Sequence, residues 1–342
     1  MKPTGKKSAA SKAKTLVLLS VVTLLVLSLG TVVADRAKPE PDPPSVTDVA
    51  RSMARAEAKS LQARARELAA NAAPGGMKRA LINTADMLSR HASQLAAPAP
   101  ASPSPDPSEL PSAVASAAAS GTKDAGSAPT VPGLVAALTA NAKTMRLDAR
   151  DVNAGMAGLL ATTSAQQFVR ATALAAKAEL PAPGLPPLPA RGDRAELADC
   201  QASGKVSGQA SSRASEARSA AALQATYSGL QRTVYAYEVA TPQFSEPLFS
   251  LSRKRLQQHK RALEQGERML ESLCADVPVA EPAYALPNGF REDPAHGLAR
   301  VEEGLAAMYA DLVGLSPEDV RAWSISMLTR ASMAAQQWEN RA

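Results

Sequence analysis

Apolar residues recur at helical spacing in eight segments of this chain. The first four segments cover residues 46–71, 77–95, 134–151 and 154–180, and their apolar positions are mostly Ala, Leu and Met. A Pro-Gly-Gly break at residues 74–76 separates the first two segments, because this combination ends one helix and turns the chain into the next. The pattern predicts an all-α protein.

The last third of the chain has the most regular pattern. Its four segments carry apolar series with spacings of three, four or seven residues: Leu223, Tyr227, Leu230, Val234 and Tyr237; Phe249, Leu256, Leu263 and Leu270; Leu298, Val301, Leu305, Met308 and Leu312; Trp323, Met327, Ala331, Ala334 and Trp338. Short turns join the segments within each pair, and a long Pro-containing connection, residues 277–294, joins the pairs. This layout predicts a ferritin-like four-helix bundle over residues 210–342.

Pro-rich stretches divide the chain into regions. Residues 96–132 form a Pro/Ala/Ser tract that cannot bury enough apolar surface to fold, and residues 181–209 form a second linker. An Ala-rich helical region, residues 45–180, lies before this second linker. Its last helix contains Ala-Gln-Gln-Phe at 165–168, and the final helix of the chain contains Ala-Gln-Gln-Trp at 335–338. This short sequence similarity is compatible with the Ala-rich region being a degenerate copy of the C-terminal bundle, and the sequence alone leaves this alternative open.

An uncharged segment rich in Leu and Val, residues 15–34, follows a basic tail, residues 1–14. The segment is long enough to cross a bilayer as a helix, and the lysines before it predict that the chain after it lies outside the cytoplasm. Small residues before the charged, Pro-rich spacer at 35–44 also fit a signal-peptidase site, so secretion after cleavage near Ala34 is the alternative. Both outcomes export the protein, and we expect a single-pass membrane protein with an extracytoplasmic C-terminal part.

The formal net charge of +6 does not indicate a nucleic-acid binder. Five lysines in the basic tail supply most of this charge, and the rest of the chain is nearly neutral. A nucleic-acid-binding surface needs a basic stripe, and the sequence has none. We therefore expect the membrane as one partner, reached through the N-terminal helix, and no nucleic acid.

Four stretches of the C-terminal part carry a resemblance to a known family. They are Tyr-Ser-Gly-Leu-Gln-Arg-Thr-Val-Tyr-Ala-Tyr at 227–237, His-Lys-Arg-Ala at 259–262, Ala-Glu-Pro-Ala-Tyr-Ala-Leu-Pro at 280–287 and Glu-Glu-Gly-Leu-Ala-Ala-Met-Tyr-Ala-Asp-Leu-Val at 302–313. Over residues 210–342 the chain resembles an actinobacterial ferritin-like domain family of unknown function. The resemblance implies a four-helix fold, a cell-envelope setting and no assigned enzymatic activity. The chain departs from the family at Leu230 and Gln231, where members often have Glu-His.

A ferritin-like di-iron site needs a Glu from each of two helices and a Glu-x-x-His from each of the other two. Glu238 flanks the apolar series of its helix, and Glu302 and Glu303 lie beside the third series. His259 falls on the inner side of the second helix, where it fits a histidine that lines the core better than a metal ligand. His259, Glu302 and Glu238 are the only candidates for a degenerate metal site, and we expect no cofactor.

The other histidines and the cysteines offer no catalytic site. His91 and His296 are separated from His259 along the chain, and both are predicted to have surface or capping roles. Cys200 and Cys274 are the only cysteines, and an even pair outside the cytoplasm favours a disulfide. Two unpaired thiols, or one reactive thiol, are the alternatives. The sequence contains no phosphate-binding loop and no nucleophile elbow.

These observations predict an exported, membrane-anchored and non-catalytic helical module of the cell envelope. Its ferritin-like bundle would act as a scaffold for an envelope protein or another envelope component. Two alternatives stay open. One is a metal-binding ferritin-like protein with a degenerate site around His259 and Glu302, and the other is a bundle that holds a small apolar ligand between its helices.

Overall fold

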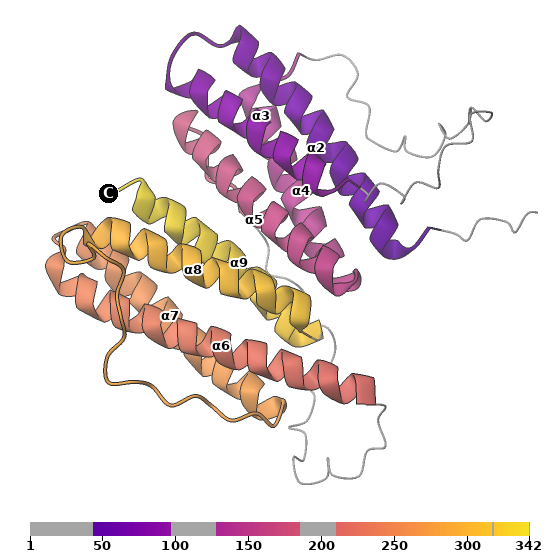
Figure 1. The fold of residues 1–342 in the computed structure, drawn as a ribbon. Helices are drawn as coiled ribbons and strands as arrows, with labels where there is room; N and C mark the ends of the chain where they lie inside the picture. The colour runs from indigo at the N-terminus through magenta and orange to yellow at the C-terminus, as the bar shows by residue number, and fades with distance from the viewer. Residues whose placement is uncertain (1–43, 97–127, 185–209, 317, 342) are drawn as a thin grey trace, which may run out of the picture. The chain divides into compact units, whose positions relative to one another are not determined.

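The computed structural model describes residues 44–96, 128–184, 210–316 and 318–341. These ranges hold eight α-helices, one short 3-10 helix and no β-strand (Figure 1), which confirms the predicted all-α class. In chain order they are α2 (Val46–Asn71), α3 (Gly76–Gln94), α4 (Val131–Asp151), α5 (Ala154–Lys177), α6 (Ala210–Ala240), η2 (Thr241–Gln243), α7 (Leu248–Ser272), α8 (Pro294–Leu315) and α9 (Glu318–Glu339). The described residues from Val46 onward belong to one compact unit.

Several predicted regions fall outside these ranges. They include the basic tail, the predicted membrane segment at 15–34, nearly all of the spacer at 35–44 and most of both predicted linkers. Within the part of the chain that the structure describes, no helix is long and apolar enough to span a bilayer. The membrane helix at 15–34 stays a prediction.

Polar side chains fix the starts of three helices. Thr130 precedes α4, and its Oγ1 accepts a hydrogen bond of 3.2 Å from a backbone N–H in the first turn. Asn153 does the same for α5 and Asp293 for α8, with bonds of 3.1 and 3.0 Å. Each bond satisfies an amide N–H that the first helical turn leaves without a partner. α4 accordingly begins at Val131, directly after its capping residue, rather than at residue 134 as predicted.

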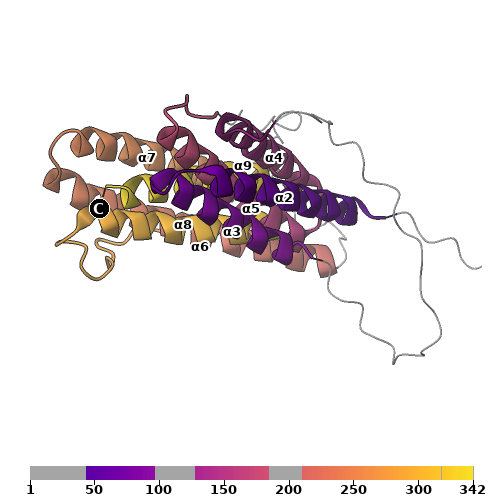
Figure 2. The same cartoon turned by 90° about the horizontal axis from the view of Figure 1, so that it is seen from above.

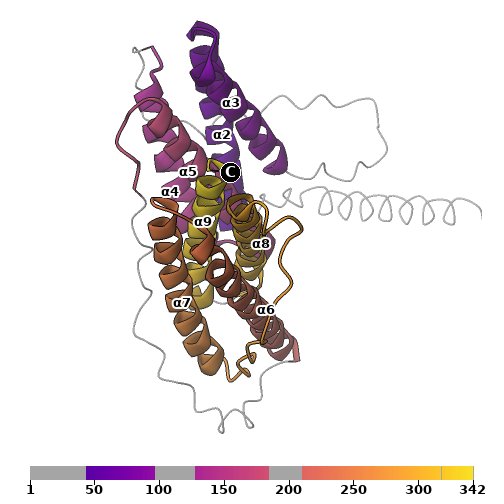
Figure 3. The same ribbon diagram turned by 90° about the vertical axis from the view of Figure 1, so that its left-hand side faces the viewer.

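The helices pair as hairpins, α2 with α3, α4 with α5, α6 with α7 and α8 with α9, and further contacts join α2 with α4, α3 with α5 and α6 with α8. Side chains also join α7 to α9. Arg255 of α7 donates to Gln337 of α9 at 2.8 Å, and Trp323 of α9 donates to Gln265 of α7 at 2.9 Å. Figure 3 shows α6 and α8 on one side of this group and α7 and α9 on the other. Each of these four helices therefore has two neighbours within the group and one face directed into it.

The connection between α7 and α8 returns along the helices, because both helices point toward the same end of the group (Figure 1). Two glutamines of α6 hold it. Gln224 donates to the carbonyl of Asp276 at 2.8 Å, and Gln231 donates to that of Pro278 at 2.9 Å. The phenol of Tyr284, further along the connection, donates to Gln231 Oε1 at 3.2 Å. Gln231, where the sequence departs from the family that it resembles, thus has a structural role that sequence reasoning missed.

The helix pairs α4/α5 and α8/α9 pack against each other through small residues. A Cβ at Gly158 in α5 would lie 3.3 Å from the carbonyl oxygen of Ala310 in α8. In the same way, a Cβ at Gly314 in α8 would lie 3.2 Å from the carbonyl oxygen of Ala154 in α5. Because both obstacles are backbone atoms, side chains at these two positions would force the helices apart.

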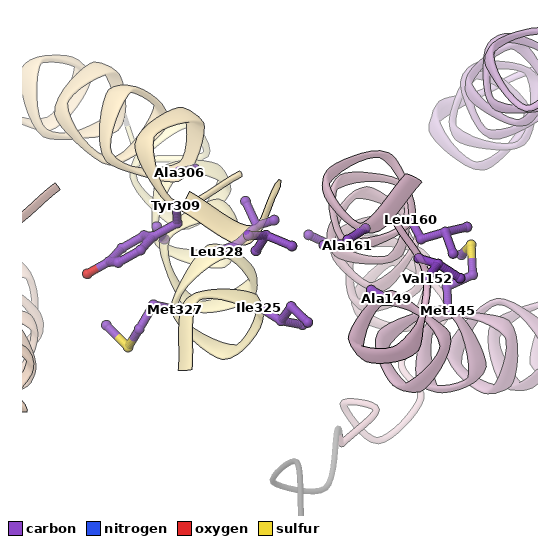
Figure 4. Close-up of a cluster of buried hydrophobic side chains, with 14 of the residues drawn as sticks. Met145, Ala149, Val152, Leu160, Ala161, Ala306, Tyr309, Ile325, Met327 and Leu328 are labelled. Atoms are coloured by element: carbon purple, nitrogen blue, oxygen red, sulfur yellow. The ribbon is translucent and has the colours of Figure 1, made fainter. Parts of the chain in front are cut away.

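A continuous hydrophobic cluster surrounds this contact (Figure 4). Ile325 and Leu328 of α9 point toward α5, where Ala161 meets them, and Met145 and Leu160 extend the cluster between α4 and α5. All five side chains are at most 2% exposed. The N-terminal helices therefore share a core with the C-terminal ones, which the sequence alone could not decide.

Replacing Gly158 by Val should destabilise the compact unit. The new side chain would push α5 away from the carbonyl of Ala310, and overpacking of this kind costs about 1–3 kcal/mol. Gly304→Val is the matched control, because this exposed glycine of α8 has no heavy atom within 4 Å of its Cβ position. Thermal unfolding followed by circular dichroism should give a lower midpoint for Gly158→Val only. Equal midpoints would contradict the close approach of α5 and α8.

Candidate functional site

Each of the helices α6 to α9 contributes one large side chain to a hydrogen-bonded group in the interior. Tyr237 comes from α6, His259 from α7, Glu302 from α8 and Trp338 from α9. Tyr237, Glu302 and Trp338 are fully buried, and His259 is 6% exposed. We call these four residues the buried polar network.

One carboxylate oxygen collects the hydrogen bonds of the network. Glu302 Oε1 accepts the phenol O–H of Tyr237 at 2.6 Å and lies 2.8 Å from His259 Nε2. The indole N–H of Trp338 donates to the Tyr237 hydroxyl at 2.6 Å. With an ionised carboxylate as the acceptor, His259 Nε2 has to be the donor, which assigns the proton to this ring nitrogen. Tyr237 and His259 thus bond directly to the carboxylate on α8, and Trp338 of α9 acts on it through the Tyr237 hydroxyl.

Aromatic rings enclose the network. The Tyr237 ring lies 5.1 Å from the His259 ring and 6.1 Å from the Trp338 ring, measured between centroids. Phe244, just after α6, stacks on Trp338 at 5.3 Å. Because Tyr237, Glu302 and Trp338 have no exposed surface, the hydrogen bonds to Glu302 act in a medium of low dielectric constant, where they are stronger than in water.

The structure corrects the prediction that Glu302 lies beside the core. The buried positions of α8 include Leu298, Glu302, Leu305, Tyr309 and Leu312, whereas Val301 and Met308 of the predicted series are only partly buried. Both series have spacings of three and four residues, so periodicity alone does not choose between them. A buried carboxylate is unfavourable unless other parts of the fold supply hydrogen-bond donors, and the sequence of α8 does not reveal those donors.

His259 lies on the buried face of α7, as the sequence predicts, but its neighbours on that face differ from the predicted ones. Ser252, His259 and Gly266 recur every seven residues and are all buried. Of the predicted series, Leu270 alone is fully buried, and Phe249, Leu256 and Leu263 are partly buried. A Cβ at Gly266 would lie 3.1 Å from the ring of Tyr227. Gly266 of α7 therefore makes room for the ring of Tyr227 from α6.

Three buried side-chain atoms of α7 and α8 have no hydrogen-bond partner: Glu302 Oε2, His259 Nδ1 and Tyr309 Oη. Burial, followed by the negative charge of Glu302, raises the pKa of the Tyr309 phenol. The same two causes, in the same order, raise the pKa of Tyr237 well above its ordinary value. Both phenols therefore stay protonated at neutral pH, and Tyr237 keeps its proton available for Glu302.

The residues present do not fit a di-iron site. Among the four side chains of the network, only Glu302 is a carboxylate and only His259 is an imidazole, while a di-iron site needs four carboxylates and two histidines. Glu238, the third candidate from the sequence, is exposed and pairs with Lys260 at 2.7 Å. In the described ranges no three His, Cys, Asp or Glu side chains come together in a group that could hold a metal ion.

His91 is buried, so the surface or capping role predicted for it is wrong. Its side chain is 2% exposed, and its Nε2 lies 2.7 Å from Gln166 Oε1 of α5. Burial lowers the pKa of the imidazole, the hydrogen bond to Gln166 opposes this shift, and the charge of Arg90 lowers the pKa further. The adjacent Gln167 accepts a hydrogen bond of 2.9 Å from Asn141. The helices α3 to α5 thus carry polar pairs of their own, each with at least one buried member, which only the tertiary structure reveals.

The remaining candidates lie away from the network. His296 is exposed at the start of α8, a surface position as predicted, and its Nδ1 lies 3.4 Å from a carboxylate oxygen of Glu339. Cys274 follows α7 and is disulfide-bonded. Cys200, the partner that the sequence predicts, lies outside the described residues. A reactive thiol at Cys274 is therefore no longer an alternative.

A comparison with known protein families matches the C-terminal part of the chain. Residues 220–342 match the family described as "Domain of unknown function (DUF4439)". The chain carries a DUF4439 domain at its C-terminus. This domain begins inside α6 and contains all four residues of the buried polar network. No curated protein and no solved structure matches the chain. The family confirms a domain of unknown function here, and the ferritin-like and actinobacterial parts of the predicted resemblance stay predictions.

Glu302→Ala should lower the free energy of unfolding by about 3–5 kcal/mol, because it leaves the buried donors of Tyr237 and His259 without an acceptor. Glu302→Gln should cost less, since an amide oxygen can still accept from Tyr237. Glu303→Ala, at the exposed neighbouring position, is the control and should change stability by about 0.5 kcal/mol or less. Urea unfolding measures all three values. A loss for Glu302→Ala no larger than that for Glu303→Ala would contradict the network.

His91 should make stability depend on pH. Its pKa is lowered in the folded protein, so the unfolded chain binds the proton more readily. The contribution of His91 is fully present above its ordinary pKa of about 6.5 and is lost as the pH falls through the folded-state pKa. His91→Gln should flatten this part of the stability curve, because glutamine does not titrate. Urea unfolding between about pH 7.5 and 5 measures the slopes, and parallel curves for wild type and His91→Gln would refute the assignment.

Proposed function

We propose that the chain is an exported, membrane-anchored and non-catalytic helical module that serves as a scaffold for an envelope protein or another envelope component. Its C-terminal domain is a ferritin-like four-helix bundle in which the buried polar network takes the place of a metal centre. The observation that carries this proposal is the bonding of Glu302, whose Oε1 is held by Tyr237 and His259 from two other helices. A carboxylate that is bonded to side chains of two other helices joins these helices to its own, and this is a structural role.

The helix connections support the ferritin-like assignment. Two hairpins, α6/α7 and α8/α9, are joined by one long connection that runs back along the group, and α6 contacts α8. Ferritin-like folds have this combination of one long crossover and two short turns. Their metal ligands project inward from all four helices, as the residues of the network do here.

The first four helices support a duplication. Contacts of α2 with α3, α4 with α5 and α2 with α4 repeat those of α6 with α7, α8 with α9 and α6 with α8. On this basis residues 45–180 are a degenerate copy of the C-terminal bundle that has become fused to it through a shared core.

A second candidate function is the binding of a single metal ion next to Glu302. It is favoured by Glu302 Oε2, a buried carboxylate oxygen without a hydrogen-bond partner. Oxygen and imidazole nitrogen atoms suit divalent transition metals such as iron, manganese and zinc. If such an ion binds, Glu302 would hold it, and His259 would join only by exchanging its hydrogen bond to Glu302 for a bond to the metal, so the module would no longer be purely structural.

Metal analysis separates the two candidates. The full chain, purified in detergent without chelator or affinity tag, should contain far less than one equivalent of iron, manganese or zinc, and its thermal midpoint should not rise when these ions are added. One equivalent of metal that disappears in Glu302→Gln but not in Glu303→Gln would replace the scaffold proposal by the metal-binding one. Crosslinking in native membranes tests the scaffold directly, and a folded, anchored chain that crosslinks to no envelope component would count against it.

A further inference from the structure

Exposed apolar side chains gather at one end of the compact unit. Among the described residues, seven large apolar side chains are exposed. Five of them lie within about two helical turns of the end at which α2 begins. These five, which we call the apolar end patch, are Val46 (66% exposed), Val49 (41%), Met53 (61%), Leu147 (47%) and Leu315 (45%).

Hydrogen bonds and close contacts bring the three chain segments of the patch together. The backbone N–H of Asn153, in the turn between α4 and α5, donates to Thr47 Oγ1 of α2 at 3.1 Å. Gly314, next to Leu315 at the end of α8, lies against the carbonyl of Ala154 at the start of α5. The start of α2, the α4–α5 turn and the end of α8 therefore share one end of the unit, and the C-terminal residues lie at the other end (Figures 1 and 2).

The first turns of α2 present a continuous apolar face. Val46, Val49 and Met53 follow one another at spacings of three and four residues, beside the buried face that contains Ala50 and Ala54. No charged side chain falls on the exposed face between Val46 and Met53, because Asp48 and Arg51 lie elsewhere around the helix and pair with each other. Single exposed apolar residues are common on soluble proteins, but several grouped at one end indicate a surface that meets an apolar partner.

We propose that this end of the unit docks on the lipid bilayer, with the apolar end patch inserted among the lipid headgroups. The inference rests on the proposed function, because it uses the anchor predicted at residues 15–34. The short length of chain between the predicted anchor and the patch indicates that the surface covering the patch is the membrane. The spacer at 35–44 spans at most about 35 Å when fully extended, so the patch that begins at Val46 is tethered close to the membrane surface. A tether of this length keeps the effective concentration of lipid at the patch high.

The chemistry of the patch indicates insertion rather than electrostatic attraction. Its members are Val, Leu and Met, and the one arginine in the first turns of α2, Arg51, is paired with Asp48. Apolar side chains presented on a helix face enter the boundary between headgroups and acyl chains to about 5–10 Å. Docking should therefore occur on neutral phosphatidylcholine as well as on anionic lipid, and it should resist high salt.

A nitroxide placed at Met53 tests the docking. The full chain with Met53→Cys is spin-labelled without a reducing agent, so that the disulfide at Cys274 stays intact, and is reconstituted into phosphatidylcholine vesicles. The depth of the label is measured from its relative accessibility to oxygen and to a water-soluble nickel complex. The label should lie about 5–10 Å below the lipid phosphates. Leu315→Cys, from another segment of the patch, should report a similar depth. Ile82→Cys is the matched control, because Ile82 is also exposed and apolar (43%) but lies on α3, toward the opposite end of α2. Its label should remain in water.

The outcomes separate this inference from the proposed function. Flotation of the vesicles first reports whether the chain is anchored, and a chain that does not float overturns both proposals. If the chain floats but the labels at Met53 and Leu315 are as accessible to the nickel complex as the label at Ile82, the docking proposal alone is overturned. Spin–spin broadening that disappears when unlabelled chain is added would mean that a second copy covers the patch. Protection in native membranes but not in pure lipid would mean a protein partner, and either result rejects the bilayer as the occupant.

Discussion

The burial of one carboxylate sets a requirement that the whole C-terminal domain has to meet. A charge removed from water destabilises a protein unless hydrogen-bond donors surround it, and Glu302 finds them on other helices, in Tyr237 and His259 directly and in Trp338 through Tyr237. A slide of any one helix by a single turn would remove a donor and leave buried groups unpaired. The network therefore fixes the register of α6 to α9 more than it adds net stability, which is the role that buried polar groups have in some other helical proteins.

The helix α8 connects this network to the rest of the molecule. One face carries Glu302 into the interior of the C-terminal group, while Ala310 and Gly314 approach the backbone of α5 on another face. A helix with a packed interior on one side and a backbone contact on the other cannot rotate to relieve strain on either side. The two groups of helices are consequently packed into one compact unit, although each has its own buried polar residues, such as His91 in the first group.

The helices could be read from the sequence because their signals are local. The segment predicted at 46–71 is observed as Val46–Asn71. Its apolar spacing lies within the segment, and the Pro-Gly break that ends it follows directly. The buried face of α8 could not be read with the same certainty, because Val301 and Met308 give an equally good apolar series beside Glu302. The burial of His91 could not be predicted from the sequence either, since its hydrogen-bond partner Gln166 belongs to a helix far along the chain. Local patterns predict elements, whereas the burial of a polar residue depends on donors and acceptors that only the tertiary fold brings close.

The network and the apolar end patch lie toward opposite ends of the C-terminal helices. Tyr237 and Trp338 lie within a turn of the ends of α6 and α9, and Glu302 lies about 20 Å from Leu315 along the axis of α8. If the patch end rests on the bilayer, the half that contains the network points away from it, because α8 has no break that would let the two halves bend separately. A partner from the envelope would then meet the distal ends of α6 and α9 and the start of α8. The buried hydrogen bonds of Glu302 hold these helices in fixed register, so on the scaffold proposal the carboxylate that organises the core would also set the surface offered to that partner.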